Sequence, residues 1–463
     1  MTRWLPDIET KSGPRYLAIA QALAEDVEEG RLEPGSRLPT HRDLAFRLGL
    51  TVGTVSRAYA EGQRLGLLSG EVGRGTYVRN NGNSLGTLDS REILPEGQVD
   101  LSLNYPPISG IEEQAMRRAL RAVADSNDLS QLLNYQHHGA SAAQFDTAAQ
   151  WLAHADVPVA PECLIITAGL QHAMTICIAA LCEPGDVVLA ENLTYPGIRA
   201  LGRMHHLRLQ GVSMDDLGLI PDAFEAACRT GPVRALYTIP TLQNPTATIL
   251  PEDRRHQIAD IARRYGVTII EDDLYGFHLP GAPPRFAALA PDITIYLTSV
   301  SKCLMPGLRV GFAIPPERLI SKLSAMVRST LWMNAPPMIE VFRQLVVSGD
   351  AERVVTARHA EAAARQAIAQ RILGEFVELP HRMSPHLWLP LPEHWQGNDF
   401  VSHARTRNVI VSTADDFALT HETGANHARL CLGCPPSRSV LETALRTIGD
   451  LLSEGPDLSW SFA

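Results

Sequence analysis

The sequence predicts a chain of two parts, a small N-terminal α+β domain and a large α/β domain with a smaller C-terminal α+β region. Three observations support this prediction. The 463 residues exceed the length of one ordinary domain. Signals for short capped helices and a hairpin fill the first eighty residues. After residue 160, apolar strands alternate with helical segments, which is typical of a mainly parallel sheet with helices on both faces.

The N-terminal segment is predicted to form a helix-turn-helix behind a first helix. The first helix is indicated by apolar residues at helical spacing, namely Leu17, Ala20, Leu23, Ala24 and Val27. Thr40 and Asp43 form a capping-box start for a short helix that ends at Gly49, and a second short helix follows. That second helix would present four side chains to a DNA groove, namely Thr51, Thr54, Ser56 and Arg57.

The stretch LLSGEVGRGTYVRN, after Gly66, predicts two strands around a Gly-Arg-Gly turn, as in the wing of a winged helix-turn-helix. Arg74 at the tip could reach a minor groove or phosphates. Residues 31–79 hold eight arginines against four acidic residues, a net charge of +4 in a chain of net charge −10. A solvated basic face would explain this charge alone. Together with the helix pair and the wing, however, the charge favours DNA binding.

The large part follows a polar stretch without periodicity, residues 80–99, which we expect to be a linker. The N-terminal domain would then span residues 1–79 and the large domain residues 100–463. Strands are expected at 164–167, 187–191, 234–239, 267–271, 294–298 and 310–314. A long helical stretch begins near Arg318, and HLWLPL and ARLCLG are candidate strands of the C-terminal region.

The stretch SVSKCLMPGLRVG places a lysine among the groups that an aldehyde cofactor needs. The amine of Lys302 can form a Schiff base with pyridoxal phosphate, and Ser299 and Arg309 would bind the phosphate. An exposed lysine beside a strand end is the alternative, since most lysines lie on the surface. Polar residues at the ends of the preceding strands favour the cofactor site.

The carboxylate that such a cofactor needs at its ring nitrogen is predicted in VTIIEDDLYG. Asp272 lies just past the carboxyl end of an apolar strand, where ligands of open α/β sheets gather. Asp273 is the alternative, although its side chain should point the other way. Tyr275 is placed to donate its hydroxyl to the ring oxygen of the cofactor.

Three further stretches supply candidate contacts. In QNPTA, Asn244 follows a strand and could reach the ring oxygen, although Asn-Pro is also a plain turn signal. In TAGLQHA, a helix opens at Gly169 and Leu170, and its free backbone NH groups would receive a phosphate. In ENLTYPG, Tyr195 leaves a strand end and could stack on a flat ring. A half-buried loop tyrosine is the alternative.

From about Asp100 onwards, these stretches together resemble the fold type I, class I aminotransferases. The resemblance implies that Lys302 is the Schiff-base residue, Asp272 the partner of the ring nitrogen, and Tyr275 and Asn244 the partners of the ring oxygen. It also implies a role for Arg429, in HARLCLG, in binding a carboxylate of the ligand. Tyr135, in NYQHHG, resembles a tyrosine that reaches the phosphate in the neighbouring subunit.

The N-terminal stretches GSRLPTHRDLA, TVSRAY and GRGTYV resemble the winged helix-turn-helix of the GntR family, which adds Arg42 to the candidate DNA contacts. A GntR-type domain joined to an aminotransferase-like domain is similar to the MocR (GabR-like) subfamily of transcriptional regulators. This chain departs from the family pattern at Gly62, where a core leucine is usual, at Gln144 and at Ala247. Gly62 would weaken its helix by about 1 kcal/mol or leave a small cavity.

The resemblance implies a regulator that senses an amino compound by aldimine exchange at Lys302, and that binds double-stranded operator DNA as a head-to-tail homodimer with two half-sites. The alternative is an active aminotransferase with an accessory DNA-binding module. Relatives respond to γ-aminobutyrate, taurine, pyridoxal phosphate itself or diaminobutyrate-type compounds, and no residue here selects among them. Arg429 indicates an anionic group on the ligand. Activation and repression are equally compatible with the sequence.

Other classes of function find little support in the sequence. No apolar run is long enough to cross a membrane and no hydrophobic signal core is present, so we expect a cytoplasmic protein without a membrane partner. Seven scattered cysteines favour reduced thiols. Cys431 and Cys434 form a single CxxC pair, which is a poor zinc signal without further ligands, and no metal is expected.

Overall fold

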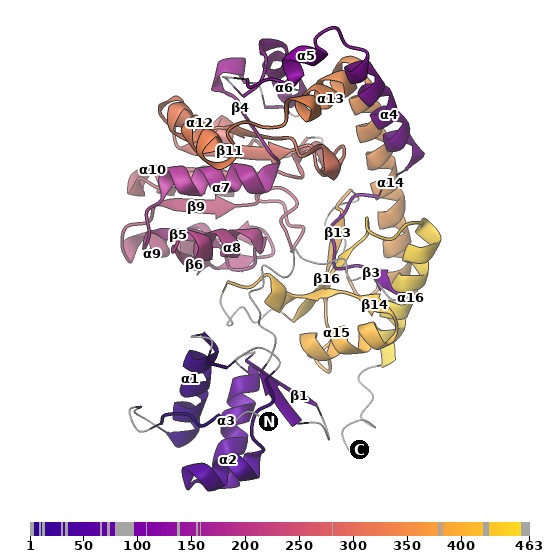
Figure 1. Ribbon diagram of the computed structural model, residues 1–463. Helices are drawn as coiled ribbons and strands as arrows, with labels where there is room; N and C mark the ends of the chain where they lie inside the picture. Colours follow the sequence, from indigo (N-terminus) through magenta and orange to yellow (C-terminus); the bar gives the residue numbers. More distant parts are fainter. Residues whose placement is uncertain are drawn as a thin grey trace. The chain divides into compact units, whose positions relative to one another are not determined.

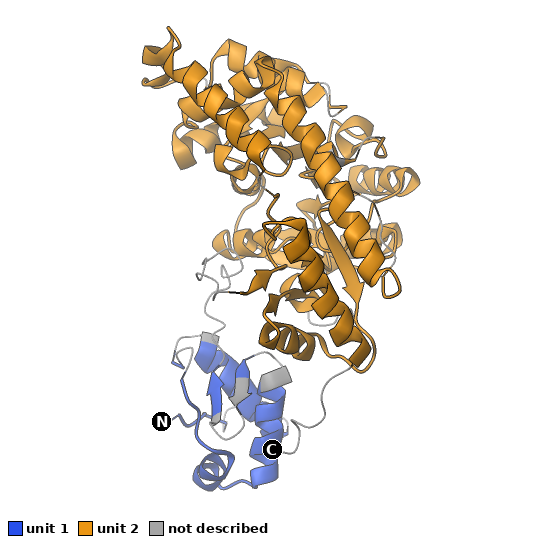
Figure 2. Cartoon of the chain, turned by 90° about the vertical axis from the view of Figure 1, so that its right-hand side faces the viewer, with its two compact units in different colours: residues 1–92 blue, residues 93–463 orange. Residues whose placement is uncertain are grey.

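The computed structural model describes residues 4–8, 11, 14–28, 31–32, 36–64, 67–71, 75–78, 97–107, 109–136, 139–153, 156–157, 159–279, 281–377, 381, 383–419 and 426–454. The chain divides into two compact units, residues 1–92 and 93–463 (Figure 2). Most of the expected linker, and Arg74 at the tip of the expected wing, lie outside the described residues. No helix within those residues is both long and apolar enough to cross a bilayer.

The smaller unit has the predicted winged helix-turn-helix elements: α1 (Arg15–Glu28), α2 (His41–Leu48), α3 (Val52–Arg64), β1 (Leu68–Glu71) and β2 (Gly75–Val78). The side chain of Thr40 accepts a hydrogen bond from the backbone NH of Asp43, and Gly49 ends α2 in the left-handed conformation. The strands β1 and β2 pair antiparallel, with Leu68 opposite Val78. One apolar core, including Leu23, joins α1, α3 and the hairpin.

The expectation of a cavity at Gly62 is wrong. A Cβ atom at this position would lie 2.9 Å from Leu23 Cδ2 and 2.9 Å from Leu68 Cδ1. Both leucines are buried, so they fill the space that a larger side chain at position 62 would take. The glycine is therefore required by the close packing of α3 against α1 and β1.

The larger unit is built on a seven-stranded sheet of order β4-β12-β11-β10-β9-β5-β6. In Figure 1 this order runs from β4 at the top to β6 at the bottom. The strands are β4 (Ile165–Thr167), β5 (Val187–Glu191), β6 (Arg208–Val212), β9 (Ala235–Thr238), β10 (Thr268–Asp272), β11 (Thr294–Ser299) and β12 (Gly311–Ile314). Only β12 runs antiparallel to its neighbours, which confirms the mainly parallel sheet.

Helices cover both faces of this sheet because alternate strand residues are apolar on each face. Leu236 of β9 packs with α9 and α10, whereas Tyr237 packs with α7, α8 and α12 on the opposite face. The helices of this part are α4 (Gly110–Ala124), α5 (Leu129–Leu132), α6 (Ala142–Ala153), α7 (Leu170–Leu181), α8 (Gly197–Met204), α9 (Pro221–Arg229), α10 (Glu252–Tyr265), α11 (Phe286–Leu289), α12 (Glu317–Leu331) and α13 (Pro336–Val347). A short hairpin joins β7 (Met214–Asp215) to β8 (Gly218–Leu219).

The long helix α14 (Asp350–Leu373) leads into the C-terminal α+β region. This region contains β13 (His386–Pro390), α15 (Gly397–Thr406), β14 (Val409–Ile410), β15 (Ser412–Thr413), β16 (His427–Cys431) and α16 (Arg438–Glu454). β13, β16 and β15 form an antiparallel sheet. The entry segment, which we define as residues 97–107, begins with β3 (Val99–Asp100), and β3 pairs with β14. Val99, expected at the end of the linker, thus belongs to this region.

Two of the departures from the family pattern have a visible structural setting. Ala247 is buried and has φ 60°, a left-handed conformation in which a glycine would be unstrained. It follows the peptide bond between Asn244 and Pro245, which is cis. Gln144 is buried in α6, where its Nε2 donates a hydrogen bond to the carboxylate of Glu340 at 3.1 Å.

Replacing Gly62 with leucine should lower the stability of the smaller unit by about 1–3 kcal/mol, because the new side chain overpacks Leu23 and Leu68. Hydrogen exchange of the α3 amides, followed by mass spectrometry, measures the effect in the whole chain. Gly53→Ala is the matched control on the same helix. A Cβ at Gly53 meets only Thr51 Oγ1, at 3.9 Å, so this change should be neutral or slow the exchange. Unchanged protection in Gly62→Leu would contradict the packing argument.

Candidate cofactor site and DNA-binding surface

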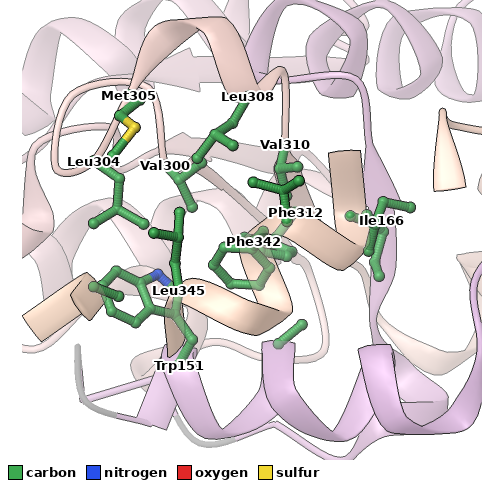
Figure 3. Close-up of a cluster of buried hydrophobic side chains, with 14 of the residues drawn as sticks. Trp151, Ile166, Val300, Leu304, Met305, Leu308, Val310, Phe312, Phe342 and Leu345 are labelled. Atoms are coloured by element: carbon green, nitrogen blue, oxygen red, sulfur yellow. The ribbon is translucent and has the colours of Figure 1, made fainter. Parts of the chain in front are cut away.

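The Lys302 loop, residues 300–310, joins β11 to β12 and is anchored in a large apolar core. Leu304 and Leu308 are fully buried and belong to one cluster with Phe342 of α13. Figure 3 shows these side chains with Phe312, whose ring centroid lies 5.6 Å from that of Phe342. This packing fixes the backbone of the loop, so the functional side chains that it carries project from a rigid support.

Lys302 is half-buried, and its Nζ donates a hydrogen bond to the backbone carbonyl oxygen of Asn104. Burial lowers the pKa of Lys302 to about 8, and the positive charges of Arg429, Arg309 and Arg358 act in the same direction. More of this amine is therefore uncharged near neutral pH than for an exposed lysine. The uncharged amine is the form that attacks a carbonyl group.

Asn104 of the entry segment connects Lys302 to Tyr275. Its Nδ2 donates a hydrogen bond to Tyr275 Oη at 2.7 Å and lies 3.5 Å from Nδ1 of His386. Burial lowers the pKa of His386 to about 3, so the ring is neutral. Its Nε2 lies 3.1 Å from the carbonyl oxygen of Gln243. No motif marks Asn104 or His386 in the sequence, because these contacts join segments far apart in the chain.

The two adjacent carboxylates at the end of β10 have different partners. Asp272 is buried, and its Oδ2 accepts a hydrogen bond from Tyr237 Oη at 2.6 Å. Asp273 Oδ2 accepts instead from Arg285 Nε at 2.6 Å and from Tyr296 Oη at 2.8 Å. Asp273 already has a cation, so Asp272 is the carboxylate available to a protonated ring nitrogen. Burial raises the pKa of Asp272 to about 7, and a cationic partner would lower it again.

Tyr237 was not among the residues predicted for the site. It lies opposite Ile270 in the parallel register of β9 and β10, on the same face as Asp272 two residues further on. The apolar stretch around it reads only as a buried strand. The pairing register, which the sequence does not reveal, brings its hydroxyl to Asp272.

The side chains predicted to bind a phosphate gather at the N-terminus of α7. Gly169 precedes this helix with φ 83°, and a Cβ there would lie 2.5 Å from Arg309 Nη2. Arg309 Nη2 donates to the carbonyl oxygen of Ala168 at 3.0 Å. Ser299 is aligned with Gly311 across the sheet, and a Cβ on Gly311 would lie 2.8 Å from Gly169 Cα. The guanidinium of Arg309 thus lies at the helix NH groups near Leu170, with Ser299 on the adjacent strand, and these are groups of the kind that bind an anion.

Arg429 of β16 lies beside Asn244. Its Nη1 donates to Asn244 Oδ1 at 2.8 Å, and its Nη2 donates to the carbonyl oxygen of Ser102. The guanidinium carbon lies 4.4 Å from the ring centroid of Phe417. Within the described part of the chain, Arg429 Nε has no hydrogen-bond acceptor. Arg429 thus has no carboxylate partner there, unlike the buried Arg285.

The two predicted tyrosine contacts have different surroundings. Tyr195 is half-buried, its Oη donates to Gln171 Oε1 at 3.2 Å in the first turn of α7, and burial raises its pKa to about 12. Tyr135 is 74% exposed and packs edge to face against Trp332, with 6.1 Å between ring centroids. Tyr195 therefore lies beside the first turn of α7, and Tyr135 lies on the surface.

The predicted DNA contacts lie in the smaller unit, on α2 and at the start of α3. Arg42, Thr51 and Arg57 are exposed, whereas Thr54 and Ser56 are half-buried. Thr51 Oγ1 lies 2.9 Å from Thr54 Oγ1, and Ser56 Oγ lies 3.2 Å from Nδ1 of His41. The Arg57 guanidinium lies over the ring of Tyr16, 6.0 Å from its centroid. Thr51, Thr54, Ser56 and Arg57 thus each have a side-chain partner within the unit.

The cysteine pair noted in the sequence lies next to the entry segment, at the candidate cofactor site. Cys431 is buried, its Sγ lies 3.7 Å from the carbonyl oxygen of Ser102, and Cys434 is half-buried. Burial raises the pKa of both thiols, which makes them poor nucleophiles. Over the described ranges, no three His, Cys, Asp or Glu side chains gather as a metal site would require.

The groups that meet around Lys302 fit pyridoxal phosphate. They comprise a nucleophilic amine, a buried carboxylate without a cation, a tyrosine hydroxyl with an asparagine amide, and an anion site. The approach of Arg309 to Gly169 is a cradle that any side chain at position 169 would fill. The donor set therefore matches the carbonyl, the ring nitrogen, the ring oxygen and the phosphate of the cofactor.

Comparisons with known proteins agree with this chemistry. Residues 96–448 match the family described as aminotransferase class I and II, and residues 15–78 match the bacterial regulatory proteins of the gntR family. The chain is 27% identical, over 97% of both chains, to the uncharacterized HTH-type transcriptional regulator YdeF of Bacillus subtilis. It is 28% identical to the pyridoxine biosynthesis transcriptional regulator PdxR of Corynebacterium glutamicum, over 64% of this chain and 65% of PdxR.

Solved structures show the same fold in the larger unit. An archaeal alanine:glyoxylate aminotransferase matches 86% of this chain and 99% of its own length, with 20% identity and a TM-score of 0.74. The α-aminoadipate aminotransferase LysN of Thermus thermophilus matches 80% of this chain and 96% of its own, with 24% identity and a TM-score of 0.69.

The family indicates pyridoxal phosphate as the cofactor of the larger unit, and the smaller unit is a DNA-binding domain of transcription regulators. The chain belongs to the aminotransferase class I and II family over residues 96–448 and carries a gntR family domain at residues 15–78, the combination that defines the MocR-like regulators.

Proposed function

We propose that this chain is a transcriptional regulator whose affinity for DNA is set by an amino compound that reacts at Lys302. One observation carries the proposal. The entry segment, residues 97–107, lies directly after the stretch of chain that leads from the DNA-binding unit, and it binds the two cationic side chains of the site. A ligand that engages these side chains must therefore change the contacts of the entry segment.

The contacts of the entry segment are specific. The carbonyl oxygen of Ser102 accepts a hydrogen bond from Arg429, and that of Asn104 accepts one from Lys302. Backbone bonds hold the segment to the C-terminal region as well, since Leu101 NH donates to Ile410 and Cys431 NH donates to Leu101, at 2.8 and 2.7 Å. The segment thus bridges the site and the C-terminal sheet.

The cofactor supplies an electrophilic carbonyl carbon and a ring that withdraws electrons. Lys302 would hold that carbon covalently, Asp272 would keep the ring nitrogen protonated, and Tyr275 with Asn244 would bind the ring oxygen. Ser299, Arg309 and the NH groups after Gly169 would bind the phosphate, and Tyr195 would stack on the ring. The amine of the effector would compete with Lys302, and its anionic group would take Arg429 from Ser102 and Asn244.

The size of the regulatory effect is limited by how differently the effector binds the two arrangements of the protein. A tenfold change in DNA affinity requires about 1.4 kcal/mol of such a difference. The exchange of one carbonyl partner of Arg429 for a carboxylate can supply this, because a carboxylate adds the attraction of opposite charges and can accept two hydrogen bonds from the guanidinium at once.

The proposal includes a homodimer that presents two DNA-binding units to two half-sites. Tyr135 and Trp332 form an exposed aromatic pair, 74% and 63% exposed, on the larger unit. Burial in a second copy would cover this pair and bring Tyr135 towards the partner's site. Arg42, Thr51, Thr54, Ser56, Arg57 and Arg74 remain the proposed DNA contacts.

The proposal is tested by titrating the holoprotein with amino compounds while both the visible absorbance of the bound cofactor and the affinity for its own promoter DNA are recorded. We expect the two signals to change together, and the absorbance change to be lost in Lys302→Ala. Sustained turnover with a keto acid, without any change in DNA affinity, would instead establish an aminotransferase. Tyr135→Ala, remote from Lys302 within one chain, tests the dimer separately by sedimentation.

The attachment of the cofactor to the apoprotein should show the lowered pKa of Lys302. The uncharged fraction of an amine with a pKa of about 8 rises about tenfold between pH 6 and 7 but less than twofold between pH 8 and 9. The rate, measured by absorbance and divided by that of free Nα-acetyl-lysine at each pH, should stay constant below about pH 7 and fall above pH 8, because the free lysine continues to lose its proton there. A ratio that stays constant up to pH 10 would show an ordinary lysine.

Arg42→Ala should weaken binding to promoter DNA and to unrelated DNA alike, and reduce the slope of log affinity against log salt by about 1, because Arg42 would neutralise one phosphate. Fluorescence anisotropy at several salt concentrations measures both quantities. Arg31→Ala is the control, since Arg31 is already paired with Asp26 at 2.6 Å. Equal effects of the two substitutions would remove Arg42 from the DNA surface.

A further inference from the structure

A cavity of about 40 Å³ lies beside Lys302. The entry segment forms one wall with Tyr105 and Pro106, α14 forms another with Ala362, and the C-terminal region adds Met383 and Leu432. The lining is therefore mainly apolar next to the amine of Lys302. A water molecule occupies roughly 10–15 Å³ in such a measure, so the cavity has room for about three or four heavy atoms.

Two arginines also line the cavity, but their charged groups are engaged elsewhere. Arg358 Nη2 donates to the carbonyl oxygen of Leu304 at 2.7 Å and lies 3.2 Å from the carboxylate of Glu112. Arg365 Nη1 donates to the carbonyl oxygen of Leu432 at 2.7 Å, and its Nε donates to Glu361 Oε1 at 2.6 Å. Each guanidinium has a carboxylate partner.

The three arginines near the cavity therefore have different roles: Arg429 is available to an anionic ligand, whereas Arg358 and Arg365 form part of the cavity wall. Arg429 donates to a carbonyl and an amide oxygen and has no carboxylate partner within the described ranges, so it can gain from a carboxylate. Arg358 and Arg365, each paired with an acid, gain little from a second anion and present their aliphatic stems. A ligand with an anionic group at the far end of its side chain would place that group in an apolar cavity at high cost.

We propose that the cavity receives the side chain of the effector, and that the effector is an amino acid with one carboxylate and an apolar side chain of about three or four carbons. This inference rests on the proposed function, because it takes Lys302 as the site of the amine. The amine meets the position of Lys302, the carboxylate pairs with Arg429, and the side chain packs on Met383, Leu432 and Ala362. Linear ω-amino acids such as γ-aminobutyrate and taurine leave the cavity empty.

The entry segment gains contacts from such a ligand, because Tyr105 and Pro106 form part of the cavity wall. An apolar side chain would therefore add packing on the same segment whose carbonyl oxygens bind Lys302 and Arg429. Glycine, which has the amine and the carboxylate alone, would engage both cations without this packing. A comparison of the affinities of the two ligands therefore distinguishes the contribution of the polar contacts from that of the apolar packing.

The experiment titrates the holoprotein with glycine, L-alanine, L-leucine, γ-aminobutyrate and taurine, with the absorbance of the bound cofactor and the affinity for promoter DNA recorded together. Leucine should bind up to roughly 60-fold more tightly than alanine, since its side chain has three more carbon atoms and each buried methylene contributes about fourfold. γ-Aminobutyrate and taurine should bind more weakly than leucine.

Ala362 lines the cavity from α14 and is not itself one of the residues proposed for the cofactor, so Ala362→Leu fills the cavity from that wall. It should remove at least tenfold of the affinity for leucine while the affinity for glycine changes less than twofold. Ala367→Leu, on the exposed face of α14, is the matched control and should bind leucine as the wild type does. Met383→Ala should improve the binding of side chains longer than that of leucine.

The outcomes distinguish this inference from the proposed function. Equal affinities for leucine, glycine and γ-aminobutyrate, or an equal loss for all ligands in Ala362→Leu, would overturn the cavity as a side-chain site while regulation by amines could still be observed. A leucine-dependent absorbance change that Ala362→Leu abolishes, with no change in DNA affinity, would support the cavity and overturn the regulatory function.

Discussion

The hydrogen bonds from Lys302 and Arg429 to two carbonyl oxygens of the entry segment are the interactions on which the proposed function depends. A carbonyl oxygen is a neutral dipole, so it satisfies a buried cation without neutralising it. An incoming carboxylate or carbonyl compound competes with the backbone on favourable terms. Had the partners been acidic side chains, as for Arg285 with Asp273, the cations would be stable but unavailable.

The same division between occupied and available charge appears in the carboxylates of β10. Asp272 and Asp273 are adjacent and both buried, but only Asp273 has an arginine. Asp272 has the hydroxyl of Tyr237, which orients the carboxylate and leaves its charge uncompensated. Burial of that charge is unfavourable unless a cation arrives. The site is therefore organised for a ligand that brings a proton on a ring nitrogen.

The fold and the motif residues on strand ends were predictable from the sequence because their signals are local. Alternation along a strand assigned Asp272 and Asp273 to opposite sides, and the caps at Thr40 and Gly49 gave the ends of α2 correctly. The contributions of Asn104, Tyr237 and His386 were not predictable, since they depend on strand register and on contacts between distant segments. The prediction of a cavity at Gly62 was wrong, because a local helix pattern does not show that Leu23 and Leu68, which belong to other elements, fill the space beside it.

The two arginines of α14 have one more effect. Arg358 donates to the carbonyl oxygens of Pro107 and Leu304, and about two turns further along Arg365 donates to those of Leu432 and Pro435. α14 is thus hydrogen-bonded to three segments, namely the end of the entry segment, the Lys302 loop and the chain after β16. Segments that are held in this way open as one cooperative unit. We therefore expect a movement that is transmitted out of the site to be a rigid displacement of these segments along α14 rather than a local loosening.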